Sequence, residues 1–219
     1  VLTPPPIKVC AARHNIPVWQ PKKLNYESFI REASAANLFI VAAYGKIIPQ
    51  MILDIPKYGA LNIHPSLLPR WRGPSPIQHT ILAGDPKTGI TIIKIDAKMD
   101  HGPIVAQSRI KNQESRITYP ILHDALAKLG AELLIEILPQ WIAGAITPMP
   151  QDETKATYCK LLAKDDGKID WQKPAEEIER MIRAFRPWPG VWTLWHTPER
   201  SIRIRIEEAD WIADETAGA

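Results

Sequence analysis

Two short apolar segments constrain the fold of this chain more than any other feature. Residues 38–43 form a continuous apolar run, which is typical of a parallel strand covered on both faces. Residues 58–61 resemble the start of a second buried strand that continues through 62–64. Pro65 ends this strand, because proline has no backbone N–H to donate to a neighbouring strand. Strand-like and helix-like segments alternate over the first two thirds of the chain, and this alternation predicts an α/β fold.

The spacing of apolar residues predicts the other elements of this region. Helices are expected over 25–36, 74–83 and 118–138, and strands over 16–19, 89–96 and 104–110. The longest helix should pack through one apolar stripe, formed by Leu122, Ala125, Leu126, Leu129, Leu133, Ile137 and Leu138.

The composition changes after residue 142. Residues 143–156 contain Pro148 and Pro150 and are typical of a linker. Beyond them a helix is expected over 174–185, and Ile alternates with Arg over 201–207, as in an antiparallel strand with one wet face. We therefore expect a small β-rich second domain over 157–219.

Composition and termini narrow the class of protein. The 219 residues carry a net charge of +3, which permits a polyanionic partner without requiring one. The two cysteines, Cys10 and Cys159, lack metal-ligand spacing and favour a reduced compartment. The sequence holds no apolar run long enough for a membrane span. Because it begins with Val1, we expect it to start inside a longer gene product, which would leave strand 38–43 at a sheet edge.

Three polar residues fall where strands are expected to end. Asn62 and His64 are two positions apart on one strand, so their side chains share a face at the end where open α/β sheets bind ligands. Asp100 follows the strand expected over 89–96. No Ser–His–Asp or Cys–His pattern accompanies them, and a metal site with His101 would lack a second ligand motif. We expect acid–base chemistry without a metal.

Longer motifs surround these residues. Residues 62–69 read Asn-Ile-His-Pro-Ser-Leu-Leu-Pro, and Asp-His-Gly follows at 100–102. The further motifs are Arg-Trp-Arg-Gly at 70–73, Pro-Ile-Gln at 76–78, the segment 156–171, and Arg-Ala-Phe-Arg-Pro-Trp-Pro-Gly at 183–190. With these motifs the chain resembles the folate-dependent formyltransferases, and within them the branch that formylates methionyl-tRNA.

The resemblance implies a fold and a formyl donor. Residues 1–142 would form a Rossmann-like, doubly wound, mostly parallel sheet without its N-terminal strands, and residues 157–219 part of an OB-like β-barrel that binds tRNA. The donor would be 10-formyltetrahydrofolate. Its contacts would come from Val41, Ala42, Ala43 and Tyr44 at one strand end, from Asp96, Ala97 and Lys98 in one loop, and from Ser66, Leu67, Leu68 and Pro69 in another.

The chemistry of formyl transfer gives the polar residues roles. Transfer to an amine builds negative charge on the formyl oxygen, and Asn62 can donate a hydrogen bond to that oxygen. The attacking amine must be neutral, and His64 can act as acid or base near neutrality. Asp100 would hold the imidazole and favour its protonated form.

The acceptor implied by the resemblance is initiator methionyl-tRNA, used in translation initiation. Its contacts would come from Arg70, Trp71 and Arg72 and from Lys160, Lys164 and Lys168. The enzyme would act as a monomer in the bacterial cytoplasm or an organellar matrix. Two alternatives stay open: a formyltransferase for another amine, such as an amino sugar or a purine precursor, and an inactive remnant that only binds RNA.

Overall fold

The computed structural model of the chain describes residues 3–21, 26–111 and 116–212, which fall into two compact units divided after Ala35. The first unit contains two short helices, α1 (Pro6–Arg13) and α2 (Tyr26–Ala33). The predicted strand over 16–19 is wrong, because this segment is irregular. Pro17 lies in its middle and cannot donate to a strand ladder. The expected cap of α2, Asn25, lies outside the described residues.

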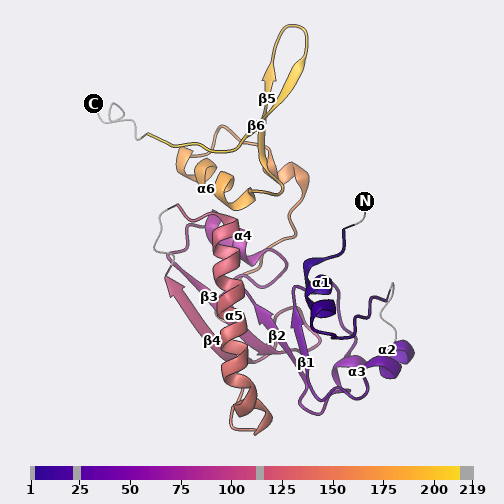
Figure 1. Cartoon of the computed structure of the whole chain (residues 1–219). Helices are drawn as coiled ribbons and strands as arrows, with labels where there is room; N and C mark the ends of the chain where they lie inside the picture. The colour runs from indigo at the N-terminus through magenta and orange to yellow at the C-terminus, as the bar shows by residue number, and fades with distance from the viewer. Residues whose placement is uncertain (1–2, 22–25, 112–115, 213–219) are drawn as a thin grey trace. The chain divides into compact units, whose positions relative to one another are not determined.

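A four-stranded sheet forms the centre of the second unit (Figure 1). Its strands are β1 (Phe39–Ala42), β2 (Ala60–His64), β3 (Lys87–Lys94) and β4 (Ile104–Lys111), in that spatial order. β1 and β2 are parallel, whereas β2–β3 and β3–β4 are antiparallel. The described part of the sheet is therefore mixed. Its parallel pair, β1 and β2, includes the strand that carries Asn62 and His64.

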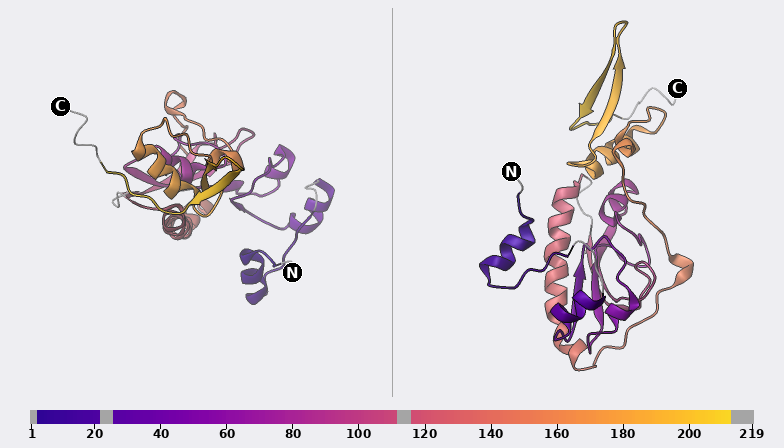
Figure 2. Two further views of the ribbon diagram at one scale, coloured as in Figure 1. Left: turned by 90° about the horizontal axis from the view of Figure 1, so that it is seen from above. Right: turned by 90° about the vertical axis from the view of Figure 1, so that its right-hand side faces the viewer.

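One long helix, α5 (Tyr119–Ile142), packs against β3 and β4, and Figures 1 and 2 show it running along the sheet. Its buried stripe contains Leu122, Leu126, Gly130, Leu133 and Ile137. The predicted stripe is confirmed at four of these positions, but Ala125 is exposed. The shorter helices of the same region are α3 (Gln50–Leu53) and α4 (Pro76–Leu82).

Burial of the strands follows their place in the sheet. β3 is central, and residues 88–93 are all buried. β1 lies at the edge of the described sheet, and Ile40 on it is 42% exposed, so the predicted cover on both faces is wrong for this strand. The sheet contributes Leu61, Ile90, Ile92 and Val105 to the buried core.

Residues 143–212 form the C-terminal region. Its elements are the short 3₁₀ helices η1 (Glu153–Lys155) and η2 (Lys164–Gly167), α6 (Ala175–Phe185), β5 (Val191–His196) and β6 (Ser201–Ile206). β5 and β6 pair as an antiparallel hairpin, and α6 packs on α4. The predicted helix and strand are confirmed here. None of the described helices is both long and apolar enough to cross a membrane.

Candidate active site

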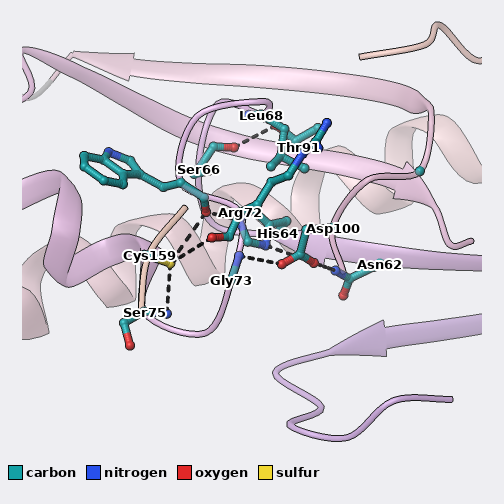
Figure 3. Close-up of polar contacts among 12 residues, drawn as sticks. Asn62, His64, Ser66, Leu68, Arg72, Gly73, Ser75, Thr91, Asp100 and Cys159 are labelled. Carbon is teal, nitrogen blue, oxygen red and sulfur yellow. Dashed lines mark hydrogen bonds and ion pairs between the residues drawn. The ribbon is translucent and has the colours of Figure 1, made fainter. Parts of the chain in front are cut away.

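Asn62, His64 and Asp100 come together at the end of β2 (Figure 3). Asn62 and His64 point the same way from β2, as their spacing predicts. Asp100 reaches them from the β3–β4 loop. Its Oδ1 atom lies 3.3 Å from Asn62 Nδ2, which donates to it, and 3.5 Å from His64 Nδ1. One carboxylate thus contacts both the amide and the imidazole, although Asp100 lies 38 positions after Asn62 in the sequence.

The backbone of the β3–β4 loop fixes the carboxylate. Asp100 has a φ of 49°, a left-handed conformation that is uncommon outside glycine. Its Oδ2 atom accepts a hydrogen bond from the Gly73 N–H at 2.8 Å. Gly102 serves close packing, because a Cβ there would lie 1.8 Å from the Lys94 carbonyl oxygen. The loop therefore turns at the aspartate itself, while the glycine lets it approach the end of β3.

His64 is a buried, neutral imidazole. Its Nε2 lies 2.9 Å from the Trp71 carbonyl oxygen, and because a carbonyl only accepts, Nε2 carries the proton and Nδ1 faces Asp100. Burial lowers the pKa of His64, and the opposing effects of the Asp100 charge and the Trp71 carbonyl do not reverse this. Asp100 therefore favours the imidazolium, as expected, but desolvation has the larger effect and leaves the pKa of His64 below its ordinary value.

The loop after β2 packs tightly beside the site. Ser66 Oγ donates to the Arg70 carbonyl oxygen at 2.6 Å, so the hydroxyl shapes the loop. Thr91 Oγ1 donates to the Ser66 carbonyl oxygen and accepts from the Leu68 N–H. Gln107 donates to the Leu68 carbonyl oxygen. Leu68 itself is buried. Leu67 and Pro69 belong to the same turn, between Ser66 and Arg70.

The other residues expected to contact folate lie at the same sheet end. The register places Val41 beside Asn62 and Ala42 beside Ile63, so the parallel strands end together. Ala43, with a φ of 50°, and the exposed Tyr44 follow directly.

The second segment expected to contact folate, residues 96–98, directly precedes Met99 and Asp100. Asp96 Oδ1 accepts from the Lys98 N–H, and its Oδ2 lies 2.6 Å from His101 Nδ1. Ala97 and Lys98 are exposed. Both segments thus flank the polar cluster with accessible residues.

Two of the three residues at 70–72 that are expected to contact tRNA form a small surface cluster. Arg70 pairs with both carboxylate oxygens of Asp85, at 2.8 and 2.6 Å, and Trp71 Nε1 donates to the same carboxylate at 2.7 Å. The Arg70 guanidinium stacks over the Trp71 ring, 4.3 Å from its centroid. This places a cation and an aromatic ring together, partly exposed.

Arg72 lies elsewhere. It is 1% exposed, and its guanidinium donates to Gln151 and Glu153. The structure therefore does not present Arg72 at the surface, and its contacts are with the segment that follows α5. No sequence pattern points to Gln151, because a single glutamine in a loop belongs to no recognisable motif.

The three lysines expected to contact tRNA are exposed. Lys160 pairs with Asp166, and Lys168 lies 6.0 Å from the centre of the Trp192 ring. Arg203 stacks over the same ring at 3.9 Å. Lys164 begins η2. A basic and aromatic surface thus lies around η2 and the β5–β6 hairpin.

No group of three or more metal-binding side chains is arranged as a metal site within residues 3–21, 26–111 and 116–212. The polar cluster at the end of β2 instead offers one hydrogen-bond donor, one neutral base and one carboxylate. That set suits proton transfer beside a carbon that becomes tetrahedral.

Known proteins resemble the chain along most of its length. The sequence is 47% identical over 212 residues to a methionyl-tRNA formyltransferase of Chloroflexus aurantiacus, covering 95% of this chain and 68% of that protein. It is 44% identical over 206 residues to a methionyl-tRNA formyltransferase of Halorhodospira halophila, covering 93% and 66%. The chain thus spans about two thirds of the length of these relatives.

Solved structures share the fold. A likely sugar N-formyltransferase from Mycobacterium tuberculosis matches with a TM-score of 0.69 at 21% identity, over 94% of this chain and 93% of that one. HypX from Aquifex aeolicus, in complex with tetrahydrofolic acid, matches with a TM-score of 0.62 at 21% identity, over 72% and 27%. The fold is thus a Rossmann-like domain followed by a small domain with antiparallel strands.

Two family models complete the comparison. The formyl transferase model matches residues 2–138, and the formyl transferase C-terminal domain model matches residues 161–219. The chain therefore belongs to the formyl transferase family.

Proposed function

We propose that the chain transfers a formyl group from 10-formyltetrahydrofolate to the α-amino group of methionyl-initiator tRNA. The observation that carries the proposal is the convergence of Asn62, His64 and Asp100 around one point at the end of β2. The names of the relatives at 44–47% identity support the tRNA acceptor, and the tetrahydrofolic acid in a structural neighbour supports the folate donor.

Asn62 supplies the oxyanion donor in this proposal. Its amide nitrogen carries two N–H groups, so it can keep Asp100 and still donate to the formyl oxygen. Such a donor stabilises the charge that develops as the amine attacks, and losing one typically costs about 3–4 kcal/mol in the barrier.

His64 supplies the base. Its Nε2 is occupied by the Trp71 carbonyl, so Nδ1 is the atom that takes the proton released by the attacking amine. The protonated ring then lies 3.5 Å from the Asp100 carboxylate, which stabilises its charge. The same proton can pass to the folate nitrogen when its bond to the formyl carbon breaks. The lowered pKa keeps the base neutral before the reaction.

The test is a formylation assay with three amines. The purified chain is mixed with 10-formyltetrahydrofolate and either methionyl-initiator tRNA, an amino sugar nucleotide or an amine-bearing purine precursor. We expect a formylated tRNA product, and Asn62→Ala should reduce turnover on the order of 10²–10³-fold. Lys128→Gln, on the exposed face of α5, is the matched control.

Each of the other outcomes has a meaning. Formylation of a sugar or purine amine but not of the charged tRNA would replace the acceptor. Tight binding of the tRNA without turnover of any amine would favour the binding-only alternative. Unchanged turnover in His64→Ala would remove the imidazole from the mechanism.

A further inference from the structure

Gln151 is a buried side chain that joins the backbone around Asp100 to the buried Arg72. Its Nε2 donates to the Asp100 and Gly102 carbonyl oxygens, each at 2.8 Å. Its Oε1 accepts from Arg72 Nε at 3.0 Å and Arg72 Nη2 at 2.8 Å. An amide has two N–H donors and one oxygen with two lone pairs, so these four bonds use its full capacity.

Arg72 anchors this glutamine. Its guanidinium also donates to both oxygens of Glu153, at 3.0 and 2.6 Å. Arg72 itself lies in the loop after β2. Its N–H donates to the Thr157 carbonyl oxygen, and its own carbonyl accepts from the Cys159 N–H. The segment 151–159 therefore holds the loop after β2 and the β3–β4 loop at once.

The hydrogen bonds from Gln151 hold a residue with a strained backbone, Asp100. Asp100 adopts a left-handed backbone, a conformation that costs of order 1–3 kcal/mol for a non-glycine residue and persists only where its surroundings impose it. Gln151 Nε2 donates to the backbone on both sides of His101, at the Asp100 and Gly102 carbonyl oxygens. The N–H of Gly73, next to Arg72, donates to the Asp100 carboxylate.

We propose that Gln151, anchored by Arg72, is a positioning residue that sets the Asp100 carboxylate against His64 and Asn62. The inference deepens the proposed formyl transfer and rests on it for the effect on turnover. It does not rest on it for the effect on the ionisation of His64, which can be measured without any substrate.

Two variants separate the parts of this role. Gln151→Met removes the donors and the acceptor and adds no charge. Gln151→Glu keeps an acceptor for Arg72 but sets a carboxylate oxygen against the two loop carbonyls. Gln140→Met is the matched control, since it makes the same change at an exposed glutamine on α5.

The first measurement is the pH titration of His64 by NMR of its ring Cε1–H. In Gln151→Met we expect the pKa of His64 to fall below that of the unaltered chain, because the favourable charge of Asp100 moves away. Gln140→Met should leave the titration of His64 unchanged. A folded Gln151→Met variant with an unchanged His64 titration would overturn the proposal, since a merely structural role lowers stability without moving this pKa.

The second measurement is steady-state formylation of charged tRNA. Because displacement of a catalytic group by about 1 Å can cost roughly 10²-fold, kcat of both Gln151 variants should fall on the order of 10–100-fold, with a smaller change in KM. If Gln151→Met does not fold, unchanged kcat in folded Gln151→Glu overturns the proposal. Absence of formylation in the unaltered chain would count against the proposed function alone, and the titration would still decide the positioning role.

Discussion

At the scale of single residues, two arginines two positions apart have opposite surroundings. The Arg70 side chain is 45% exposed and pairs with Asp85, whereas the Arg72 side chain is 1% exposed and pairs with Gln151 and Glu153. Exposed ion pairs contribute little, because water and salt screen them. A buried polar group that loses its partner instead carries the full cost of desolvation.

Arg72→Gln should therefore destabilise the fold far more than Arg70→Gln. We expect the free energy of unfolding to fall by about 1–3 kcal/mol for Arg72→Gln, since the buried Gln151 oxygen loses its donors. For Arg70→Gln the loss should stay within about 1 kcal/mol. Urea denaturation followed by circular dichroism measures both, and equal losses in the two variants would contradict the assignment.

His64 should make stability depend on pH. The imidazole titrates near 6.5 in the unfolded chain, and burial lowers its pKa in the fold. Between these two pKa values the unfolded chain binds more protons, so the free energy of unfolding falls as the pH drops below about 6.5.

His64→Gln should flatten that part of the stability profile. Denaturation at a series of pH values shows the difference between the variant and the unaltered chain. His123→Gln, which removes an exposed imidazole on α5, controls for the loss of a histidine as such. A profile as steep in His64→Gln as in the unaltered chain would contradict the prediction.

The sequence predicts that Asn62, His64 and Asp100 lie together, but it does not predict the groups that hold Asp100 in place. Asn62, His64 and Asp100 stand out because amide, imidazole and carboxylate recur in a motif. The partners of Asp100 do not, since one is the backbone N–H of Gly73 and another is Gln151, far along the chain. A backbone donor has no residue identity, so no sequence pattern can report it.

At the scale of elements, the β3–β4 loop depends on its closeness to β3. The Cβ of an alanine at Gly102 would lie 1.8 Å from the Lys94 carbonyl oxygen and 2.9 Å from its carbon, far inside contact distance. Backbone atoms cannot swing aside as a flexible side chain can, so the loop must move. Asp100, two residues before, would move with it.

Gly102→Ala should accordingly reduce formylation on the order of 10²-fold, as expected for a shift of about 1 Å. Gly45→Ala is the control, because nothing lies within 4 Å of a Cβ there. Steady-state kinetics on charged tRNA gives both values. Turnover of Gly102→Ala equal to that of Gly45→Ala would show that the loop tolerates the displacement.

Elements were predictable where local pattern and tertiary setting agree. The stripe of α5 was found because one face of a long helix meets the sheet. The segment 16–19 was misassigned because apolar residues suggested a strand, although Pro17 breaks the ladder. The exposure of β1 follows from its place at the edge of the described sheet, which we expect for strand 38–43, whereas the apolar run by itself suggests cover on both faces.

At the scale of the whole molecule, the charge is modest and its distribution matters more than its sum. The net charge of +3 is small for 219 residues. Lys164 and Lys168 nevertheless lie near Trp192 and Arg203 on the surface around η2 and β5. A polyanion would meet local cations there despite the near balance overall.

Binding of tRNA to this surface should weaken steeply with salt. Each phosphate contact adds about 0.7–0.9 to the slope of log affinity against log salt, because binding releases counterions. Lys164→Gln and Lys168→Gln should each reduce that slope by about 1, whereas Lys128→Gln on α5 should not. Filter binding at several salt concentrations measures the slopes, and identical slopes in all three variants would locate the contact elsewhere.

The hydrogen bonds from Gln151 to the Asp100 loop can form only late in the synthesis of the chain. Asp100 leaves the ribosome well before the side chain that bonds its backbone, since Gln151 follows Asp100 by 51 positions. At roughly 5–20 residues per second, translation needs several seconds to cross that interval. A nascent polypeptide therefore carries Asn62, His64 and Asp100 for some seconds before the glutamine that bonds the Asp100 backbone has been added.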